Sequence, residues 1–315
     1  MHSPGNAIDP APDDQITYRT ARDEDLVRTR EVFLLTAAAL DRQSGVPSPP
    51  TAGVAHVRGM MFREHSRLHD ADRFWVAESQ GVVIGYAAAT QRGHVWYLAS
   101  LYVLPQFQAR GVGSQLLDRC LAAEEPGSIR TTISEAIQPI SNAIYMRRGM
   151  VPQTPFLTFT GPTAGPPPAS DLRLEAFPAD CPEPGILDAF DADALGFVRP
   201  QEHQYWSRFP DLHGYFVMRG EDRAGYLYLA EDGAIGPVAV GAANDLAPVI
   251  ELAILQAHAL GAAGARVRLV GESRDAVATL LRRGFRLGGS MTLFLSSAPL
   301  VAWERYVSSG SDTYF

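Results

Sequence analysis

The sequence predicts a mixed α/β (α+β) protein of two similar domains in tandem, each a mixed, mostly antiparallel sheet flanked by helices. Three observations lead to this prediction. Strand and helix patterns follow the same order in both halves of the chain. A segment rich in proline and glycine separates the halves at residues 161–170. Two short motifs recur at nearly constant spacing. With 315 residues, the chain suits two domains of about 150 residues each.

The first half opens with a short strand and two helices, and it continues with three strands. The strand patterns at 73–78 and 82–89 join through Gln80-Gly81, a hairpin-type turn. Pro139 begins a short helix and Gly149 follows its end, which is the expected asymmetry of helix termini. The predicted elements are strand 16–20, helices 24–40 and 54–69, strands 73–78, 82–89 and 95–103, helix 112–123, strand 130–134, helix 139–148 and strand 155–160.

The second half repeats this plan. Gly85-Tyr86 recurs 140 residues later as Gly225-Tyr226, and Arg147–Met150 recurs 135 residues later as Arg282–Phe285. This small drift fits one duplicated domain with a shortened loop, because the order of elements is also shared. The predicted elements are strands 215–219, 224–229 and 234–240, helix 245–260, strand 266–270, helix 274–283 and strand 290–295.

These boundaries define five segments of the chain. We expect a disordered N-terminus (1–14), a first domain (15–160), a Pro/Gly linker (161–170), a copy of the first domain (171–297) and a C-terminal extension (298–315).

Composition and charge exclude several classes of protein. The formal net charge is −8, so binding to nucleic acid or to an anionic membrane is disfavoured as a main activity. All 27 basic residues are arginine. Without lysine, the chain cannot be a pyridoxal-phosphate enzyme or a standard P-loop nucleotidase. Only two cysteines and no long apolar run are present, so we expect a cytoplasmic, bacterial protein.

A loop with two glycines joins the strand at 95–103 to the next helix. It reads Gln108-Ala-Arg-Gly-Val-Gly-Ser114. Glycine lets the backbone approach a ligand, and the first N–H groups of a helix have no partner within the helix. These donors and the helix dipole favour an anion such as pyrophosphate, with Arg110 as countercharge; a plain tight turn is the alternative. A dinucleotide fingerprint is excluded because Leu116 occupies its third glycine position.

The same loop resembles the acyl-CoA-binding signature of the GNAT superfamily of N-acetyltransferases, Gln/Arg-x-x-Gly-x-Gly/Ala. Leu101–Pro105 is similar to the strand that leads into that loop in the family. Tyr145–Met150 is similar to the family's Tyr-x-x-x-Gly-Phe at the end of a later helix. The resemblance covers residues 15–160 and implies a tandem GNAT protein with a degenerate C-terminal copy.

The resemblance also implies roles for individual residues toward acetyl-CoA as co-substrate. The backbone of Leu101, Tyr102 and Val103 would pair with the pantetheine arm. The loop would hold the pyrophosphate through Gln108, Ala109, Arg110, Gly111, Val112, Gly113 and Ser114. Tyr145 would donate a proton to the departing CoA thiolate, whose conjugate thiol has a pKa of about 8.5. A core tyrosine is the alternative reading of Tyr145.

The general base is where the sequence departs from the family. Many members carry a glutamate near the start of the central strand, where this chain has Trp96-Tyr97. Glu78, His94 and Glu135 lie at or beside predicted strands of the first domain, but each is better explained as an ordinary solvated strand-end residue. Deprotonation of the amine through water alone is a further alternative.

The second half lacks both signatures. Gly241-Ala-Ala-Asn-Asp245 stands where the glycine loop should be, and it brings an acidic group to the place of the phosphates. Leu280 stands at the position of Tyr145. We therefore expect no acyl-CoA binding there, and instead a structural role such as covering a sheet edge of the first domain.

These observations predict an N-acetyltransferase that moves an acetyl group from acetyl-CoA to a primary amine, with Tyr145 as general acid. The alternatives are a non-catalytic acyl-CoA-binding or regulatory protein, and transfer of a different acyl group. The expected partner is a small-molecule or peptide amine, not nucleic acid or a membrane, and the protein is expected to be a monomer or homodimer. No metal is expected, since His65 and His69 share a helix without an evident third ligand.

Overall fold

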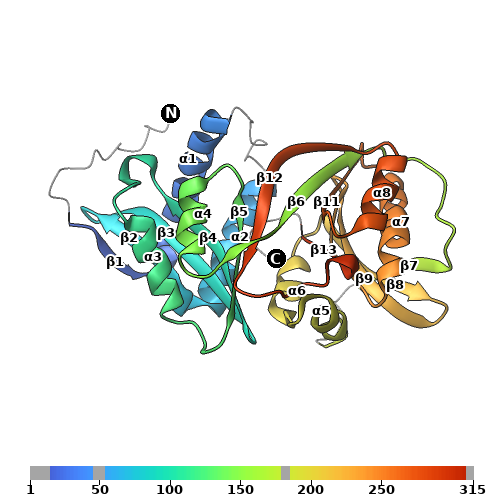
Figure 1. Cartoon of the computed structure of the whole chain (residues 1–315), viewed down its shortest axis with the longest axis horizontal. Coiled ribbons are helices and arrows are strands. Elements are labelled where there is room, and N and C mark those ends of the chain that lie inside the picture. The colour runs from blue at the N-terminus through green and yellow to red at the C-terminus, as the bar shows by residue number, and fades with distance from the viewer. Residues whose placement is uncertain (1–14, 45–53, 179–184, 310–315) are drawn as a thin grey trace. The chain divides into compact units, whose positions relative to one another are not determined.

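The computed structural model describes residues 15–44, 54–178 and 185–309 (Figure 1). Its contacts divide the chain into two compact units. The first contains the chain up to Gln91 together with Trp96–Pro126, and the second contains Arg92–Val95 and the chain from Gly127 onward. The N-terminal segment 1–14, which the sequence predicts to be disordered, lies outside the described residues. The predicted domain boundaries differ from those of the compact units and stay a prediction.

The first unit is a four-stranded sheet with helices on both faces. Its strands lie in the order β1-β2-β3-β4, and β1 and β3 both pair antiparallel with β2. The elements are β1 (Thr17–Thr20), η1 (Asp23–Asp25), α1 (Leu26–Ser44), α2 (Val54–His69), η2 (Ala71–Arg73), β2 (Phe74–Ser79), β3 (Val82–Arg92), β4 (Val95–Val103), η3 (Pro105–Phe107) and α3 (Val112–Leu121). The tip of the β3–β4 hairpin belongs to the second unit.

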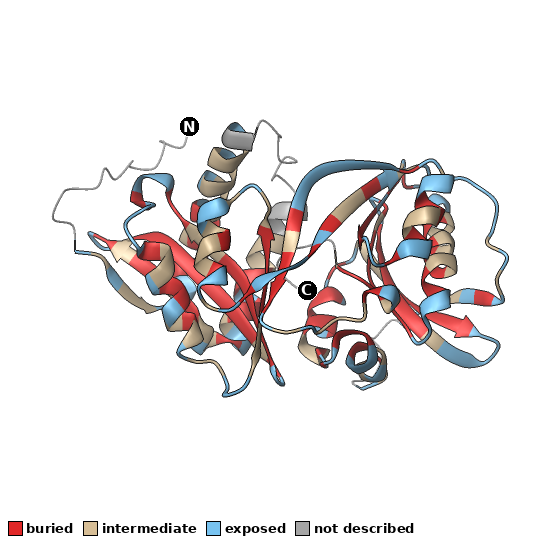
Figure 2. Cartoon of the chain, in the orientation of Figure 1, coloured by how far each residue is buried: buried red, intermediate tan, exposed pale blue. Residues whose placement is uncertain are grey.

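Neighbouring residues of β3 show which helices cover which face of this sheet. A Cβ added to Gly85 would lie 3.0 Å from the carbonyl oxygen of Tyr102 in β4 and 3.4 Å from Leu116 of α3, so glycine permits this close packing. The next side chain, Tyr86, points to the opposite face and accepts a hydrogen bond from Arg63 of α2 at 2.7 Å. Thus α3 packs on one face of β3–β4 and α2 on the other, and both strands are largely buried (Figure 2).

The second unit contains a larger sheet, in the order β5-β12-β6-β11-β10-β9-β8-β7, with β13 also paired to β10. Within the described residues its strand pairs are antiparallel, apart from β10 with β11, which is parallel. Its elements are β5 (Ile129–Glu135), α4 (Pro139–Met146), β6 (Val151–Gly161), β7 (Leu172–Ala176), α5 (Asp188–Leu195), α6 (Pro200–Trp206), β8 (Leu212–Arg219), β9 (Asp222–Ala230), β10 (Ala234–Val240), η4 (Ala243–Asp245), α7 (Leu246–Ala259), β11 (Ala265–Val270), α8 (Arg274–Arg282), β12 (Arg286–Ser296), η5 (Trp303–Arg305) and β13 (Tyr306–Val307).

The two halves of the sequence exchange strands within this unit. The strand β12, from the second half, lies between β5 and β6 of the first half. In turn β6 pairs with β11 and β12, with Phe159 opposite Val267 and Leu287. As expected of a cover for a sheet edge, the second half therefore supplies the hydrogen-bonding partner of both strands.

Because of this exchange, we expect residues 1–160 expressed alone not to fold as a stable monomer. Removal of the second half leaves β6 without either neighbour and β5 without β12, which exposes both edges of β6 and one edge of β5. Circular dichroism and size-exclusion chromatography of this fragment test the expectation. The matched control is the full chain cleaved at a protease site inserted in residues 162–170, which keeps all strands and should keep its melting temperature. A monomeric 1–160 fragment that unfolds cooperatively would show that the first half folds without the strands of the second half.

The internal repeat is visible in the way two helices of the second unit end. After α4, Met150 N–H donates to Tyr145 O at 3.2 Å, and Gly149 has φ +85°. After α8, Phe285 N–H donates to Leu280 O at 3.0 Å, and Gly284 has φ +81°. Both are Schellman-type ends, which need the left-handed residue that glycine provides. The repeated sequence motif is thus a repeated structure.

The sequence analysis did not predict four elements of the second unit: β7, α5, α6 and β13. The C-terminal extension is also more ordered than a tail, because Tyr306 and Val307 are 1% exposed and pair with β10. Among the described residues, no helix combines the length and hydrophobicity needed to cross a bilayer.

Candidate active site

The predicted phosphate-binding loop begins where β4 ends, in the first unit. The carbonyl oxygen of Val103 accepts a hydrogen bond from Gln108 Nε2 at 2.9 Å, and Phe107 between them is fully buried. Gln108 therefore ties the loop back to the end of the strand, and Phe107 anchors it in the core. Leu101 and Tyr102, the other strand residues assigned to acetyl-CoA, are half-buried.

At the start of α3, the first main-chain N–H groups form no hydrogen bond within the helix. Ala109 and Gly111 have φ of +60° and +79°, and the chain then turns into α3 at Val112. The first helical hydrogen bond runs from Gln115 N–H to Gly111 O at 3.0 Å. The N–H groups of Val112 and Gly113 precede this bond and are not used by the helix itself. No side chain caps this helix start.

Few protein atoms lie close to the two glycines of this loop. A Cβ added to Gly111 would meet nothing within 4 Å, and one added to Gly113 would meet only Val103, at 3.9 Å. The loop residues Gln108 to Gly111 are exposed, whereas Val112 is buried against the core. A helix start whose first main-chain N–H groups are unused by the helix, preceded by the exposed Arg110, fits a pyrophosphate. The assignment of these residues to acetyl-CoA stays a prediction.

Tyr145 lies on α4 in the second unit, so the structure groups it apart from the loop. Its side chain is 6% exposed, and its hydroxyl is hydrogen-bonded to Ser141. Burial raises the pKa of this phenol well above its ordinary value, and the bond to Ser141 opposes the rise only in part. Burial therefore favours the protonated form of this phenol, and the role of Tyr145 as general acid stays a prediction.

Asn142 lies one helical turn before Tyr145 and is 9% exposed. Its Nδ2 donates to the carbonyl oxygen of Glu135 at 3.2 Å, whereas its Oδ1 has no hydrogen-bond partner among the described residues.

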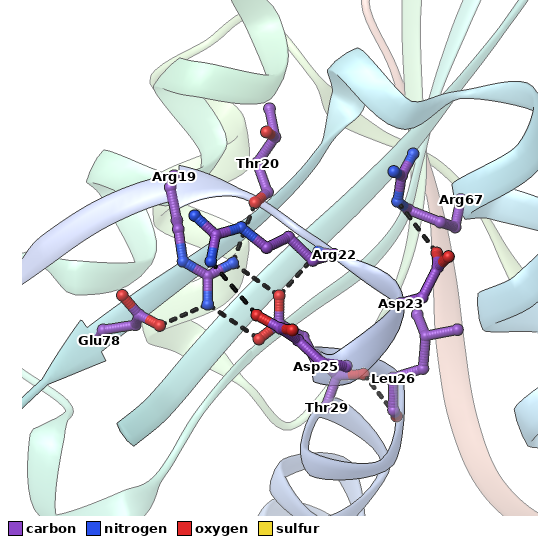
Figure 3. Close-up of polar contacts among 10 residues, drawn as sticks. Arg19, Thr20, Arg22, Asp23, Asp25, Leu26, Thr29, Arg67 and Glu78 are labelled. Carbon is purple, nitrogen blue, oxygen red and sulfur yellow. Dashed lines mark hydrogen bonds and ion pairs between the residues drawn. The ribbon is translucent and has the colours of Figure 1, made fainter. Parts of the chain in front are cut away.

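Two of the three candidate bases have structural contacts. Glu78 accepts a hydrogen bond from Arg19, which also binds Asp25 at 2.6 Å (Figure 3). Glu135 accepts a hydrogen bond from Ser290 Oγ at 3.3 Å. His94 is exposed in the turn between β3 and β4. None of these contacts marks a base for an incoming amine.

The corresponding site of the second half is closed by its own side chains. At the start of α7, Asp245 is 5% exposed and accepts a hydrogen bond from Arg219 at 2.7 Å. This carboxylate occupies the helix start that is open in α3, and like charges repel a phosphate there. Leu280, at the position of Tyr145, is fully buried and has no proton to donate. The second half is thus a degenerate copy.

The remaining candidates of the sequence analysis have structural explanations. His65 and His69 lie with ring centroids 4.4 Å apart, and within the part of the chain that the structure describes no group of three or more His, Cys, Asp and Glu gathers as a metal site. Cys120 is buried on the inner face of α3, and its thiol donates to the carbonyl oxygen of Arg73 at 3.2 Å. Burial raises the pKa of this thiol, which disfavours a reactive thiolate.

Comparison with known proteins agrees with the fold. Residues 45–150 match the model of the acetyltransferase (GNAT) family. No curated protein matches the chain in sequence.

Among solved structures, the chain is similar to a proposed acetyltransferase from Pyrococcus horikoshii, with TM-score 0.74, 13% identity and coverage of 99% of this chain and 100% of that one. It is also similar to a GCN5-related N-acetyltransferase from Sphaerobacter thermophilus, with TM-score 0.57, 17% identity and coverage of 92% and 98%. A tandem GNAT protein from the clavulanic acid biosynthesis pathway gives TM-score 0.57 and 13% identity over 90% and 99%. The predicted fold class, two tandem GNAT-like domains with mostly antiparallel sheets flanked by helices, is confirmed.

Proposed function

We propose that the protein is an N-acetyltransferase that moves an acetyl group from acetyl-CoA to a primary amine of a small molecule or peptide. The observation that carries the proposal is the open, glycine-lined start of α3, with N–H groups that the helix leaves unused. The family match of residues 45–150 supports it.

The transfer needs one nucleophile and one acid. The nitrogen of the amine attacks the thioester carbonyl carbon, the C–N bond forms and the C–S bond breaks. The departing thiolate takes the phenol proton of Tyr145, and the proton lost by the amine passes to water. A positioned acid of this kind typically contributes about 10²–10⁴-fold to the rate.

A non-catalytic acyl-CoA-binding protein is the second candidate. It is favoured by the absence of a carboxylate at Trp96 and Tyr97 and by the structural contacts of Glu78 and Glu135. The two candidates differ in turnover: a binding protein would take up acetyl-CoA and acetylate no amine.

Calorimetric titration with acetyl-CoA tests the proposed site. We expect one site per chain, and an affinity at least about tenfold lower in Gly111→Asp, because a side chain at φ +79° costs about 1–2 kcal/mol and the carboxylate repels phosphate. A smaller loss is expected for Gln108→Ala, which frees the loop from Val103.

The matched control is Gly127→Asp, at another glycine with positive φ (+81°) and open surroundings, where binding should be unchanged. Two sites per chain would show that the second half also binds acetyl-CoA. No binding to the wild-type protein would overturn the proposed function.

A further inference from the structure

Ser141 lies four residues before Tyr145 on α4, and the sequence analysis did not single it out. The hydroxyl groups of the two side chains are hydrogen-bonded to each other, as positions i and i+4 of one helix allow. Tyr145 is 6% exposed, whereas Ser141 is half-buried. Ser141 therefore joins the hydroxyl of a buried tyrosine to a position that solvent touches.

The direction of this contact matters for a tyrosine that gives up its proton. Burial raises the pKa of Tyr145, and the hydrogen bond to Ser141 opposes the rise. A hydrogen bond lowers the pKa of a phenol when it stabilises the phenolate, and toward a phenolate the Ser141 hydroxyl is the donor. A buried phenolate without such a donor is costly. Ser141 thus stabilises the form of Tyr145 that remains after proton transfer.

The degenerate copy has lost both hydroxyl groups together. At the offset of 135 residues that relates α4 to α8, Ala276 stands for Ser141 and Leu280 stands for Tyr145. Both helices end in the same Schellman-type turn, so these positions also correspond in structure. Ala276 and Leu280 are 2% and 0% exposed and belong to a hydrophobic core. The fold therefore does not need a hydroxyl at either position.

We propose that Ser141 is a positioning residue for the general acid: it donates a hydrogen bond to Tyr145 and passes on the proton that restores the phenol. This inference rests on the proposed function and adds a residue to its mechanism. As the C–S bond breaks, the proton of Tyr145 Oη goes to the sulfur of CoA. The proton of Ser141 Oγ goes to Tyr145 Oη, and a proton from water replaces it. The net change is one proton moved from solvent, which received the proton of the amine, to the thiol of CoA.

Ser141→Ala tests the inference, and it should fold because alanine occupies the same position in α8. Release of free CoA from acetyl-CoA is measured with the fastest of four acceptors: spermidine, phenethylamine, L-phenylalanine amide and glycylglycine. We expect kcat to be about 10- to 100-fold lower than in the wild-type protein, the effect of losing one hydrogen bond to a charged group. KM for both substrates, and the affinity for acetyl-CoA in calorimetry, should be unchanged.

Two controls separate this role from a structural one. Ser141→Thr keeps a hydroxyl group at this position and should keep most of the wild-type kcat. In the Tyr145→Phe background, Ser141→Ala should cause no further loss of kcat, because no phenol is left for Ser141 to serve. A serine with a merely structural role would lower kcat by the same factor in both backgrounds.

A wild-type kcat in Ser141→Ala, with Tyr145→Phe slow, would overturn the inference and leave the proposed function standing. Equal losses in both backgrounds would do the same, as would a Ser141→Thr variant no faster than Ser141→Ala. Failure of the wild-type protein to bind acetyl-CoA would instead overturn the proposed function. Acetyl-CoA that is bound but never cleaved would favour the non-catalytic protein, and the inference would fall with the proposed function.

Discussion

Replacing Asp191 by alanine is expected to destabilise the protein by about 3–5 kcal/mol, the range for removal of one partner of a buried ion pair. The Asp191 carboxylate is fully buried and accepts hydrogen bonds from Arg199, from His203 Nε2 at 2.8 Å and from Tyr226 at 2.5 Å. The substitution removes the carboxylate that these three buried groups contact. Urea denaturation followed by circular dichroism measures the loss in the free energy of unfolding.

The matched control is Asp193→Ala, which removes an exposed carboxylate two residues further along α5 and should change the free energy of unfolding by less than about 0.5 kcal/mol. Equal stability of the two variants would show that Asp191 does not hold the buried arginine.

The contribution of Asp191 should also depend on pH. Burial alone would raise the pKa of this carboxyl, but the charge of Arg199 and the hydrogen bonds outweigh burial, so the pKa is lowered on balance. A lowered pKa in the folded state means that the stabilisation is complete above the unfolded pKa of about 3.9 and is lost as the pH falls through the folded value. The difference in stability between the wild-type protein and Asp191→Asn should therefore shrink below about pH 4.

Replacing Tyr145 by phenylalanine is expected to lower kcat for acetylation by about 10²–10⁴-fold, with acetyl-CoA affinity unchanged. The substitution removes only the hydroxyl, which is the proton donor in the proposed reaction, and keeps the ring that packs in the core. Steady-state kinetics with an accepted amine and calorimetric titration with acetyl-CoA measure the two quantities separately.

Tyr215→Phe is the control for this change, because Tyr215 is also a buried tyrosine of the second unit. Its hydroxyl accepts a hydrogen bond from Gln256 Nε2 at 3.2 Å. We expect wild-type kcat in that variant. A wild-type kcat in Tyr145→Phe would show that the thiolate obtains its proton elsewhere, for example from water.

Much of the first unit was predictable because its segments carry clear local signals. The helix at 54–69 and the strand at 95–103 have the predicted bounds, since their apolar residues follow helical and strand spacing without interruption. The start of α3 was predictable for a similar reason: Gly111 adopts the left-handed conformation that its position before the helix requires. The position at which α3 begins could therefore be predicted from a few consecutive residues.

The helices α5 and α6 were not predicted, because their buried faces are polar. Asp191, Glu202 and His203 are each less than 5% exposed and interrupt the hydrophobic pattern that would mark a helix. Glu202, for example, forms a buried ion pair with Arg92 at 2.6 Å, 110 positions earlier in the chain. Such a residue looks solvated in the sequence, and only its distant partner explains its burial.

By itself, the sequence determined the class of fold, the duplication and the place of the glycine loop, because each depends on residues that are close along the chain. The tertiary structure alone decided that β12 lies between β5 and β6, since strand pairing across more than 100 residues leaves no local pattern.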